Sequence, residues 1–172
     1  MNTTIEKGKL LIAHPFLLDP NFIQTVVLVI EYEDEGAFGL VMNRPLELTV
    51  DKLSDSLGIS WGGSDPAPNV CLGGPVETQT VWVVHDGGRG IGVASEVVSH
   101  VAFSSSAPAI RSMLMEPAGR FRICLGYSGW GPGQLEKEME GGYWLLADAT
   151  PELVFDIDPA AMWLKAMQTT EE

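Results

Sequence analysis

The sequence predicts a mixed α+β fold in a single domain, and three observations support this prediction. The chain has 172 residues, which is within the usual range for one domain. Its apolar segments are short, and several are joined by hairpin-type turns rather than by helices. Only a few short stretches have helical periodicity, so the regular strand–helix alternation of a parallel sheet is absent. We therefore expect one domain over residues 1–172, with a frayed tail at 168–172.

The composition indicates a packed, strongly acidic protein. Hydrophobic residues make up 45% of the chain and charged residues 19%, which favours a folded core over disorder. The chain has 10 Lys and Arg against 23 Asp and Glu, a net charge of -13, so its average surface repels nucleic-acid backbones. The first residues lack a signal-type apolar core, and the run Leu10–Leu18 is too short to span a bilayer. We expect a cytoplasmic protein without membrane contact.

The first half of the chain is expected to begin with three strands, at Leu10–Ala13, Ile23–Tyr32 and Phe38–Met42. The middle one is rich in β-branched residues and apolar on both faces, which is typical of a central strand. The acidic turn Glu33–Gly36 joins it to the third strand in a hairpin. Between the first two strands, Asp19 followed by proline predicts a single turn.

A helix is expected after this hairpin, followed by a loop. Thr49 offers an N-cap, and Val50, Leu53 and Leu57 share one face before a glycine ends the helix. Residues 61–68 have no period and contain Gly and Pro, so they predict a surface loop.

The second half is expected to alternate short strands with short helices. The expected strands are Val70–Leu72, Val81–His85, Glu96–His100, Phe121–Leu125 and Tyr143–Ala147. Helices are expected after Ser106, over Leu135–Glu140 and after Asp158, where a cap or a first-turn proline precedes an apolar stripe. The glycine-rich residues 86–92 predict a loop, for which phosphate binding is the lesser alternative.

The stretch Gly126–Leu135 carries the densest local signal. Four glycines and Pro132 lie between an expected strand and an expected helix, so we predict a tight loop at a strand-to-helix crossing. Glycine N–H groups at a helix start could bind an anion. The Gly-Lys-Ser/Thr of a phosphate-binding loop is absent, which favours a packing corner. Trp130, in this loop, and Trp61 are the tryptophans expected to offer an exposed contact surface.

The residues show no recognisable catalytic or metal-binding constellation. His14, His85 and His100 stand apart, without the spacing of metal ligands. Cys71 and Cys124 form no C-x-x-C and are expected to be reduced thiols in the core. We therefore expect no metal and no cofactor.

A nucleophilic serine is one alternative for the site. Gly126-Tyr127-Ser128-Gly129 is similar to a nucleophile elbow, but Trp130 stands where the second glycine of that motif belongs. A hydrolase or transferase using Ser128 or a histidine is therefore kept as an alternative to a binding protein. The glutamates at 136, 138 and 140 are expected to form a solvated helix face rather than a catalytic pair.

Several motifs in a fixed order are similar to those of the YqgE/AlgH family of bacterial proteins. They are Leu10-Leu11-Ile12-Ala13 with Pro15, Asp19-Pro20-x-Phe22, Gly36-Ala37-x-Gly39-Leu40-Val41-Met42-Asn43-Arg44-Pro45, Gly73-Gly74-Pro75-Val76 and Gly126-Tyr127-x-Gly129-Trp130-x-x-Gly133-Gln134-Leu135-Glu136. The resemblance covers nearly the whole chain. It implies a forked, mixed β-sheet curled into a pseudo-barrel with helices outside it, and a cytoplasmic location. It implies no reaction, although such proteins are sometimes described as transcriptional regulators. The chain departs from the family at Glu31-Tyr32, where a histidine often follows the glutamate.

The predicted working surface gathers the glycine-rich strand ends, where folds often place sites. Its residues are Asn43, Arg44, Gly73, Gly74, Tyr127, Gly129, Trp130, Gly133 and Gln134. We expect them to form one cleft that binds an unidentified protein partner or small ligand, without catalysis.

Two groups of residues that contain arginine allow more than one interpretation. Asn43 and Arg44 could anchor a ligand, but an internal clamp on Glu31 or Glu136 is the stronger expectation. The arginines at 111, 120 and 122 could touch nucleic acid, as a directly DNA-binding regulator requires, or an acidic partner, but local charge neutralisation is favoured in so acidic a chain.

Overall fold

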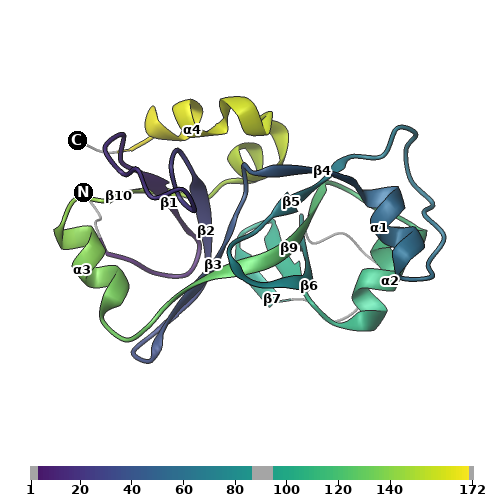
Figure 1. The fold of residues 1–172 in the computed structure, drawn as a ribbon, viewed down its shortest axis with the longest axis horizontal. Helices are drawn as coiled ribbons and strands as arrows, with labels where there is room; N and C mark the ends of the chain where they lie inside the picture. The colour runs from purple at the N-terminus through teal and green to yellow at the C-terminus, as the bar shows by residue number, and fades with distance from the viewer. Residues whose placement is uncertain (1–3, 87–94, 171–172) are drawn as a thin grey trace.

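The computed structural model describes residues 4–86 and 95–170, and it is built around one ten-stranded sheet (Figure 1). The strands are β1 (Lys9–Ala13), β2 (Val26–Glu33), β3 (Gly36–Val41), β4 (Pro45–Thr49), β5 (Asn69–Leu72), β6 (Val76–His85), β7 (Ser95–Val98), β8 (Val101–Ser104), β9 (Phe121–Trp130) and β10 (Trp144–Asp148). The helices are α1 (Val50–Ser56), α2 (Ala107–Met115), α3 (Gln134–Glu140), the π-helical turn η1 (Glu152–Asp156) and α4 (Pro159–Met167).

The sheet forks at β9. The main path runs β10-β1-β2-β3-β9-β6-β8-β7, while β4 and β5 form a side branch. The C-terminal part of β9 pairs with β3, and its middle pairs with β5, so β3 and β5 diverge from the same edge. The β5–β9 pairing is parallel and the other pairings are antiparallel, which makes the sheet mixed. The predicted forked, mixed and curled sheet is confirmed.

The helices lie outside this curled sheet. Figure 1 shows α3 at one end, α1 and α2 at the other, and α4 across the edge near β1 and β2. Two of the predicted caps form, because the Ser106 hydroxyl accepts from the Ala109 N–H and the Asp158 carboxylate accepts from the Ala160 N–H. Thr49 precedes α1 as predicted, but its side chain accepts no cap hydrogen bond and donates to Asp51 instead. After α4, hydrogen-bonded turns continue to Thr170, and residues 171–172 lie outside the described chain.

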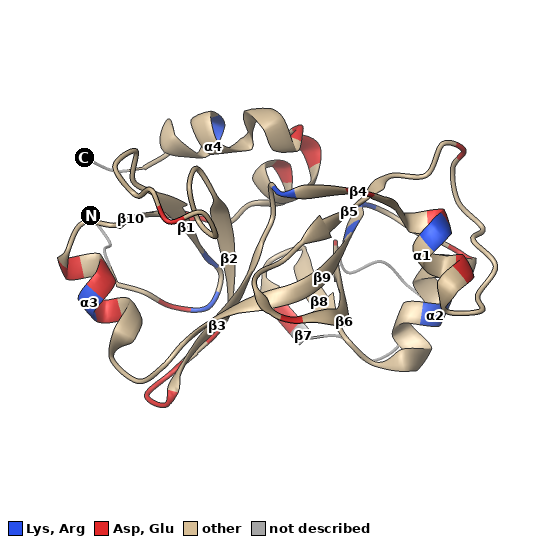
Figure 2. Cartoon of the chain, viewed as in Figure 1, with Lys and Arg blue, Asp and Glu red and all other residues tan. Residues whose placement is uncertain are grey.

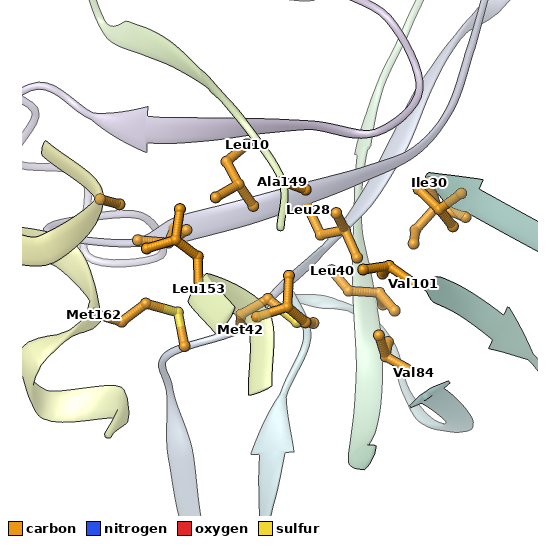
Figure 3. Packing of buried hydrophobic residues seen from close by; sticks show 14 of the residues in the cluster. Leu10, Leu28, Ile30, Leu40, Met42, Val84, Val101, Ala149, Leu153 and Met162 are labelled. Carbon is orange, nitrogen blue, oxygen red and sulfur yellow. The ribbon is translucent and has the colours of Figure 1, made fainter. Parts of the chain in front are cut away.

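Three apolar clusters fill the spaces between the sheet and these helices. The largest combines one face of the sheet with η1 and α4; in Figure 3, Leu10 and Met42 lie towards Leu153 and Met162, and Leu28 lies beside Leu40. A second lies under α3, around Trp130 and Trp144. A third lies under α1 and α2. The two-sided burial predicted for the middle strand is explained, since Leu28 enters the first cluster and Val27 and Val29 enter the second.

Four local predictions were wrong. The expected loop at Gly126–Trp130 is strand, because β9 runs without a break to Trp130. Strands β4 and β8 were not predicted, and the strand expected at 96–100 turns back at His100, which has a φ of 64°. Leu57 follows α1 and is exposed, so it does not share the buried face of that helix. Most of the predicted loop at 86–92 lies outside the described residues.

Candidate functional site

The carboxylate of Glu138 organises the region around α3. Its Oε1 accepts from the indole N–H groups of Trp130 and Trp144, at 3.0 and 2.9 Å. Its Oε2 accepts from the side-chain amide of Gln134 at 3.0 Å. Both indoles are buried, and the ring of Phe22 packs against each of them. Trp130 is therefore part of the core, which corrects its prediction as an exposed contact residue.

Glu136 is also bound rather than solvated. Its carboxylate accepts a short hydrogen bond from the Tyr32 hydroxyl. This bond, with partial desolvation and the negative charges of Glu136 and Asp34, raises the pKa of Tyr32 to about 12. Tyr32, where the family resemblance led us to expect a histidine, is thus a hydrogen-bond donor to α3. The prediction of a solvated glutamate face was wrong for positions 136 and 138.

The turn before α3 is closed by its own side chains. The N–H of Gly131 donates to the Gln134 side chain at 3.0 Å, and the carbonyl of Gly131 accepts from the Gln134 N–H. Gly133 is the N-cap of α3 and has a φ of 75°, a conformation that glycine adopts without strain. These contacts favour the packing corner over an anion site for this stretch.

Gly73 and Gly74 lie where the sheet forks. The carbonyl of Gly73 accepts from the Val41 N–H of β3, while its N–H donates to Leu125 of β9. A Cβ on Gly73 would overlap the Gly126 carbonyl, and one on Gly74 would overlap Tyr127. These glycines therefore allow three backbones to meet, which explains their place in the sequence motif.

Ser128 lies at this same fork and is fully buried. Its hydroxyl donates to the carbonyl of Gly73 at 3.1 Å. His85 is also buried, and it contacts Ser104 rather than Ser128. Desolvation lowers the pKa of His85, against a smaller opposite effect of Asp86. The nucleophile-elbow interpretation requires an accessible hydroxyl, and Ser128 does not present one.

Asn43 and Arg44 hold the turn at residues 19–25. Arg44 donates to the carbonyls of Pro20 and Ile23, at 3.3 and 2.7 Å. The Asn43 amide donates to the carbonyl of Gln24 at 2.9 Å, and its oxygen accepts from the N–H that begins β2. The predicted internal clamp exists, but its partners are backbone carbonyls instead of Glu31 or Glu136.

The length of β3 separates the two ends of the predicted surface, and the turn at residues 19–25 contacts both ends. Trp130 pairs with Ala37 at the start of β3, whereas Asn43 lies six residues further along. At about 3.3 Å per residue, the strand between Ala37 and Val41 alone accounts for ~13 Å of separation. The turn bridges it, because its carbonyls bind Arg44 and its Phe22 ring packs on Trp130. The predicted single cleft is thus divided into an α3 corner, a glycine fork and the Asn43–Arg44 clamp. The Tyr127 backbone lies against Gly74 at the glycine fork, while its ring packs in the core against Phe38 and Trp82. Gly129 of β9 pairs with Phe38 of β3.

Two adjacent cavities open beside the clamp, and together we call them the α4 groove. One, of about 390 Å³, lies between Ile23 and Arg44 on one side and Trp163 and Leu164 of α4 on the other. The second, of about 450 Å³, extends from the clamp to Cys71 and Arg122. The two share Asn43, Pro159 and Ala160.

Two contacts fix the C-terminal wall of the α4 groove. The Trp163 indole donates to the carbonyl of Ala13 at 2.8 Å, which attaches α4 to the end of β1. Arg122 donates to the carbonyls of Val154 and Ile157, at the end of η1. The sequence indicated caps at Asp158 and a cluster of arginines, but nothing local indicated that they meet Asn43 across more than a hundred residues.

Of the arginines at 111, 120 and 122, only Arg120 forms ion pairs within the described residues; Arg111 contacts the Met115 sulfur and Arg122 binds carbonyls, so local neutralisation was predicted correctly for one of the three. Arg120 pairs with Asp86 and Asp156 and lies over the ring of Phe155. Among the residues that the structure describes, no group of three possible metal ligands comes together. In the same residues, no helix has the length and apolar character needed to cross a bilayer.

Comparison with known proteins identifies the family. The family model described as AlgH-like matches residues 10–172. The chain belongs to the AlgH-like family. Among relatives, a UPF0301 protein of Myxococcus xanthus is 42% identical over 156 residues, covering 90% of this chain and 84% of that protein. A UPF0301 protein of Caulobacter vibrioides is 37% identical over 164 residues, covering 93% and 84%.

Two solved structures extend the AlgH-like assignment to the fold. The solution structure of the AlgH protein from Pseudomonas aeruginosa aligns with a TM-score of 0.80 at 32% identity, covering 98% of this chain and 90% of that one. A crystal structure of a protein from Corynebacterium diphtheriae aligns with a TM-score of 0.79 at 22% identity, covering 98% and 88%. The second likeness concerns the fold alone. The recognition of an AlgH-like chain from its motifs is confirmed.

Proposed function

We propose that this AlgH-like protein is a non-enzymatic binding protein that holds a small ligand, with an apolar body and an anionic group, in the α4 groove. The observation that carries the proposal is the pair of adjoining cavities that share Asn43, Pro159 and Ala160. Each cavity has a volume within the range of small-molecule sites, and each combines apolar side chains with a few polar ones. A binding role follows from this shape without requiring a reacting group.

The charge of the groove supports an anionic ligand. Arg44 borders one cavity and Arg122 the other, and within the described residues neither forms an ion pair with a carboxylate. Asp158 also borders the second cavity, where its carboxylate accepts from the Ala160 N–H at the start of α4. Both guanidinium groups are bound by neutral carbonyls instead. Their positive charge is therefore available to a carboxylate or phosphate, in a chain whose net charge is -13.

The test is a thermal-shift screen with carboxylates, phosphates and nucleotides, because a ligand that binds only the folded state raises the melting temperature. Ala160→Phe should abolish the shift, since Ala160 is exposed and borders both cavities. Ala161→Phe is the matched control, because Ala161 is also exposed on α4 but borders neither cavity. A ligand whose shift survives Ala160→Phe binds elsewhere and contradicts the proposal.

A protein partner is the second candidate, favoured by exposed apolar side chains, of which Leu164 lines the groove. Phe16, Leu18 and Leu164 are 84%, 70% and 64% exposed. Such residues on the surface are typical of interaction sites when they gather. If a purified partner loses affinity on Phe16→Ser and Leu18→Ser while the thermal shifts stay, the surface rather than the groove carries the function.

Catalysis and direct DNA binding have less support. A hydrolase or transferase would need an accessible nucleophile, and the Ser128 hydroxyl is buried and bonded to Gly73. Direct DNA binding by a regulator would need free basic side chains, and Arg120 is already paired with two carboxylates. We place the binding function in the cytoplasm, where the free Cys71 and Cys124 thiols stay reduced.

A further inference from the structure

We propose that Cys71 and Cys124 are an oxidisable thiol pair, in which Cys71 reacts with a small hydroperoxide and Cys124 then closes a disulfide. The inference goes beyond ligand binding and does not depend on it. It rests on the register of two strands, on the different access of the two thiols, and on an arginine that acts on both of them and borders the cavity that Cys71 lines.

The strand register places the two cysteines side by side. Cys71 of β5 is the direct partner of Cys124 of β9 in the parallel branch of the fork. Paired residues of parallel strands point to the same face, and both thiols enter the same apolar cluster. Neighbouring strands are about 4.8 Å apart, within the range of about 4.4–6.8 Å that a disulfide needs between Cα atoms. The pair can therefore be bridged without moving the strands apart.

Access distinguishes the two thiols. Cys71 borders the larger cavity of the α4 groove, whereas Cys124 does not border it and is fully buried. In the reduced state the Cys71 sulfur lies 3.9 Å from the carbonyl of Met42. A small oxidant that enters the groove thus meets Cys71 first, and Cys124 lies behind it.

The surroundings also activate Cys71 selectively. Arg122 borders the same cavity and its positive charge favours a thiolate. The hydrogen bond from Cys124, together with the charge of Arg122, lowers the pKa of Cys71 against the opposing effect of burial. The same hydrogen bond and burial raise the pKa of Cys124, and they outweigh the opposite effect of the Arg122 charge on that thiol. The thiol that borders the cavity is the nucleophile, and the one behind it keeps its proton until the second step.

The two steps balance with the hydroperoxide as oxidant. The Cys71 thiolate attacks the terminal oxygen, the O–O bond breaks, and the alkoxide or hydroxide leaves as an alcohol or water after taking a proton. Cys71 becomes a sulfenic acid. The Cys124 sulfur then attacks the Cys71 sulfur, the S–O bond breaks, and water leaves with the Cys124 proton. The products are one disulfide, one alcohol or water, and one further water.

The experiment uses the full chain treated with hydrogen peroxide and followed by mass spectrometry. We expect the intact protein to lose two hydrogens and to yield a linked peptide pair containing Cys71 and Cys124. In Cys124→Ala the sulfenic acid should persist on Cys71 and be trapped by dimedone. In Cys71→Ala the remaining thiol should stay unmodified while the fold is intact, as checked by circular dichroism.

Access through the groove is tested without touching either thiol. Ala160→Phe should slow oxidation several-fold, and Ala161→Phe should leave the rate unchanged. The proposal is overturned if both thiols stay reduced in the folded chain and react only after unfolding. It is equally overturned if Cys124 is trapped first, or if peroxide links two chains instead of closing an internal bridge. None of these outcomes depends on whether a ligand binds the groove.

Discussion

Glu138 stabilises the α3 corner because its one carboxylate accepts hydrogen bonds from three donors. The donors are the indoles of Trp130 and Trp144 and the amide of Gln134. The two indoles are 5% and 3% exposed, so neither can turn to water if the carboxylate is removed. A buried donor left without a partner costs about 1–3 kcal/mol.

We therefore predict that Glu138→Ala lowers the free energy of unfolding by about 2–4 kcal/mol. Glu140→Ala is the matched control, because Glu140 is an exposed glutamate two residues away on the same helix; it should change stability by less than ~0.5 kcal/mol. Urea unfolding followed by tryptophan fluorescence measures both. Equal effects of the two substitutions would show that the indole contacts contribute nothing specific.

Tyr32 gives a second prediction, about pH. Its pKa is raised from 10.0 to about 12, chiefly by donation to Glu136. The neutral phenol is the donor, so the stabilisation is complete below pH 10 and is lost as the pH rises towards about 12. The ultraviolet difference titration between wild type and Tyr32→Phe should be centred near the upper value. A difference centred at the ordinary tyrosine value would contradict the contact.

At the level of elements, the fork depends on glycines that leave room for backbone. Gly73 touches β3, β5 and β9 at once, and a Cβ there would overlap the carbonyl of Gly126. Gly129 lies on β9 shortly after Gly126, but a Cβ on Gly129 would meet nothing closer than the Tyr127 ring at 3.5 Å. Both glycines belong to sequence motifs, but only Gly73 is closely surrounded by other backbone.

Gly73→Ala should accordingly lower the free energy of unfolding by about 3 kcal/mol, because overpacking forces the strands apart. Gly129→Ala should cost less than ~1 kcal/mol, since only ordinary contacts form. Chemical denaturation compares the two variants, and circular dichroism checks that each keeps its sheet. The fork would not need a glycine if Gly73→Ala were as stable as Gly129→Ala.

The sequence predicted most elements, and the errors share a physical cause. The glycines in Gly126–Trp130 are typical of a turn, yet here Gly126, with a φ of 75°, lets β9 pass close to Gly74. A single sequence does not distinguish a glycine that turns the chain from one that makes room for another strand. Strand β4 was not predicted because Pro45–Thr49 is short, begins with proline and pairs only with β5.

At the scale of the whole molecule, the candidate site was the part that the sequence predicted least well. The motif residues were identified, but their distances depend on the curl of the sheet and on the turn at 19–25. Asn43 and Pro159 both line the α4 groove, and their proximity follows from how α4 packs near β1 and binds its end (Figure 1). Local patterns carry periodicity and caps, whereas this contact depends on tertiary packing.

The distribution of charge is a second property of the whole molecule. Figure 2 shows acidic residues at the tip of the β2–β3 hairpin, on α3 and around η1. The chain carries a net charge of -13, and three ion pairs are formed within the described residues. Most of the negative charge is therefore unpaired, and folding brings these charges closer together than they are in the unfolded chain.

We predict that the folded state becomes more stable as salt is added from low ionic strength. The Debye length falls from about 30 Å at 0.01 M to about 8 Å at 0.15 M, so repulsion between distant carboxylates is screened first. Two of the ion pairs involve Arg120, which is partly exposed, so their own loss to screening is small. The melting temperature measured in sodium chloride should rise over this range. A fall in the melting temperature would mean that attractive ion pairs outweigh the repulsion between the excess negative charges. Comparing sodium chloride with sodium sulfate separates screening from anion binding in the α4 groove.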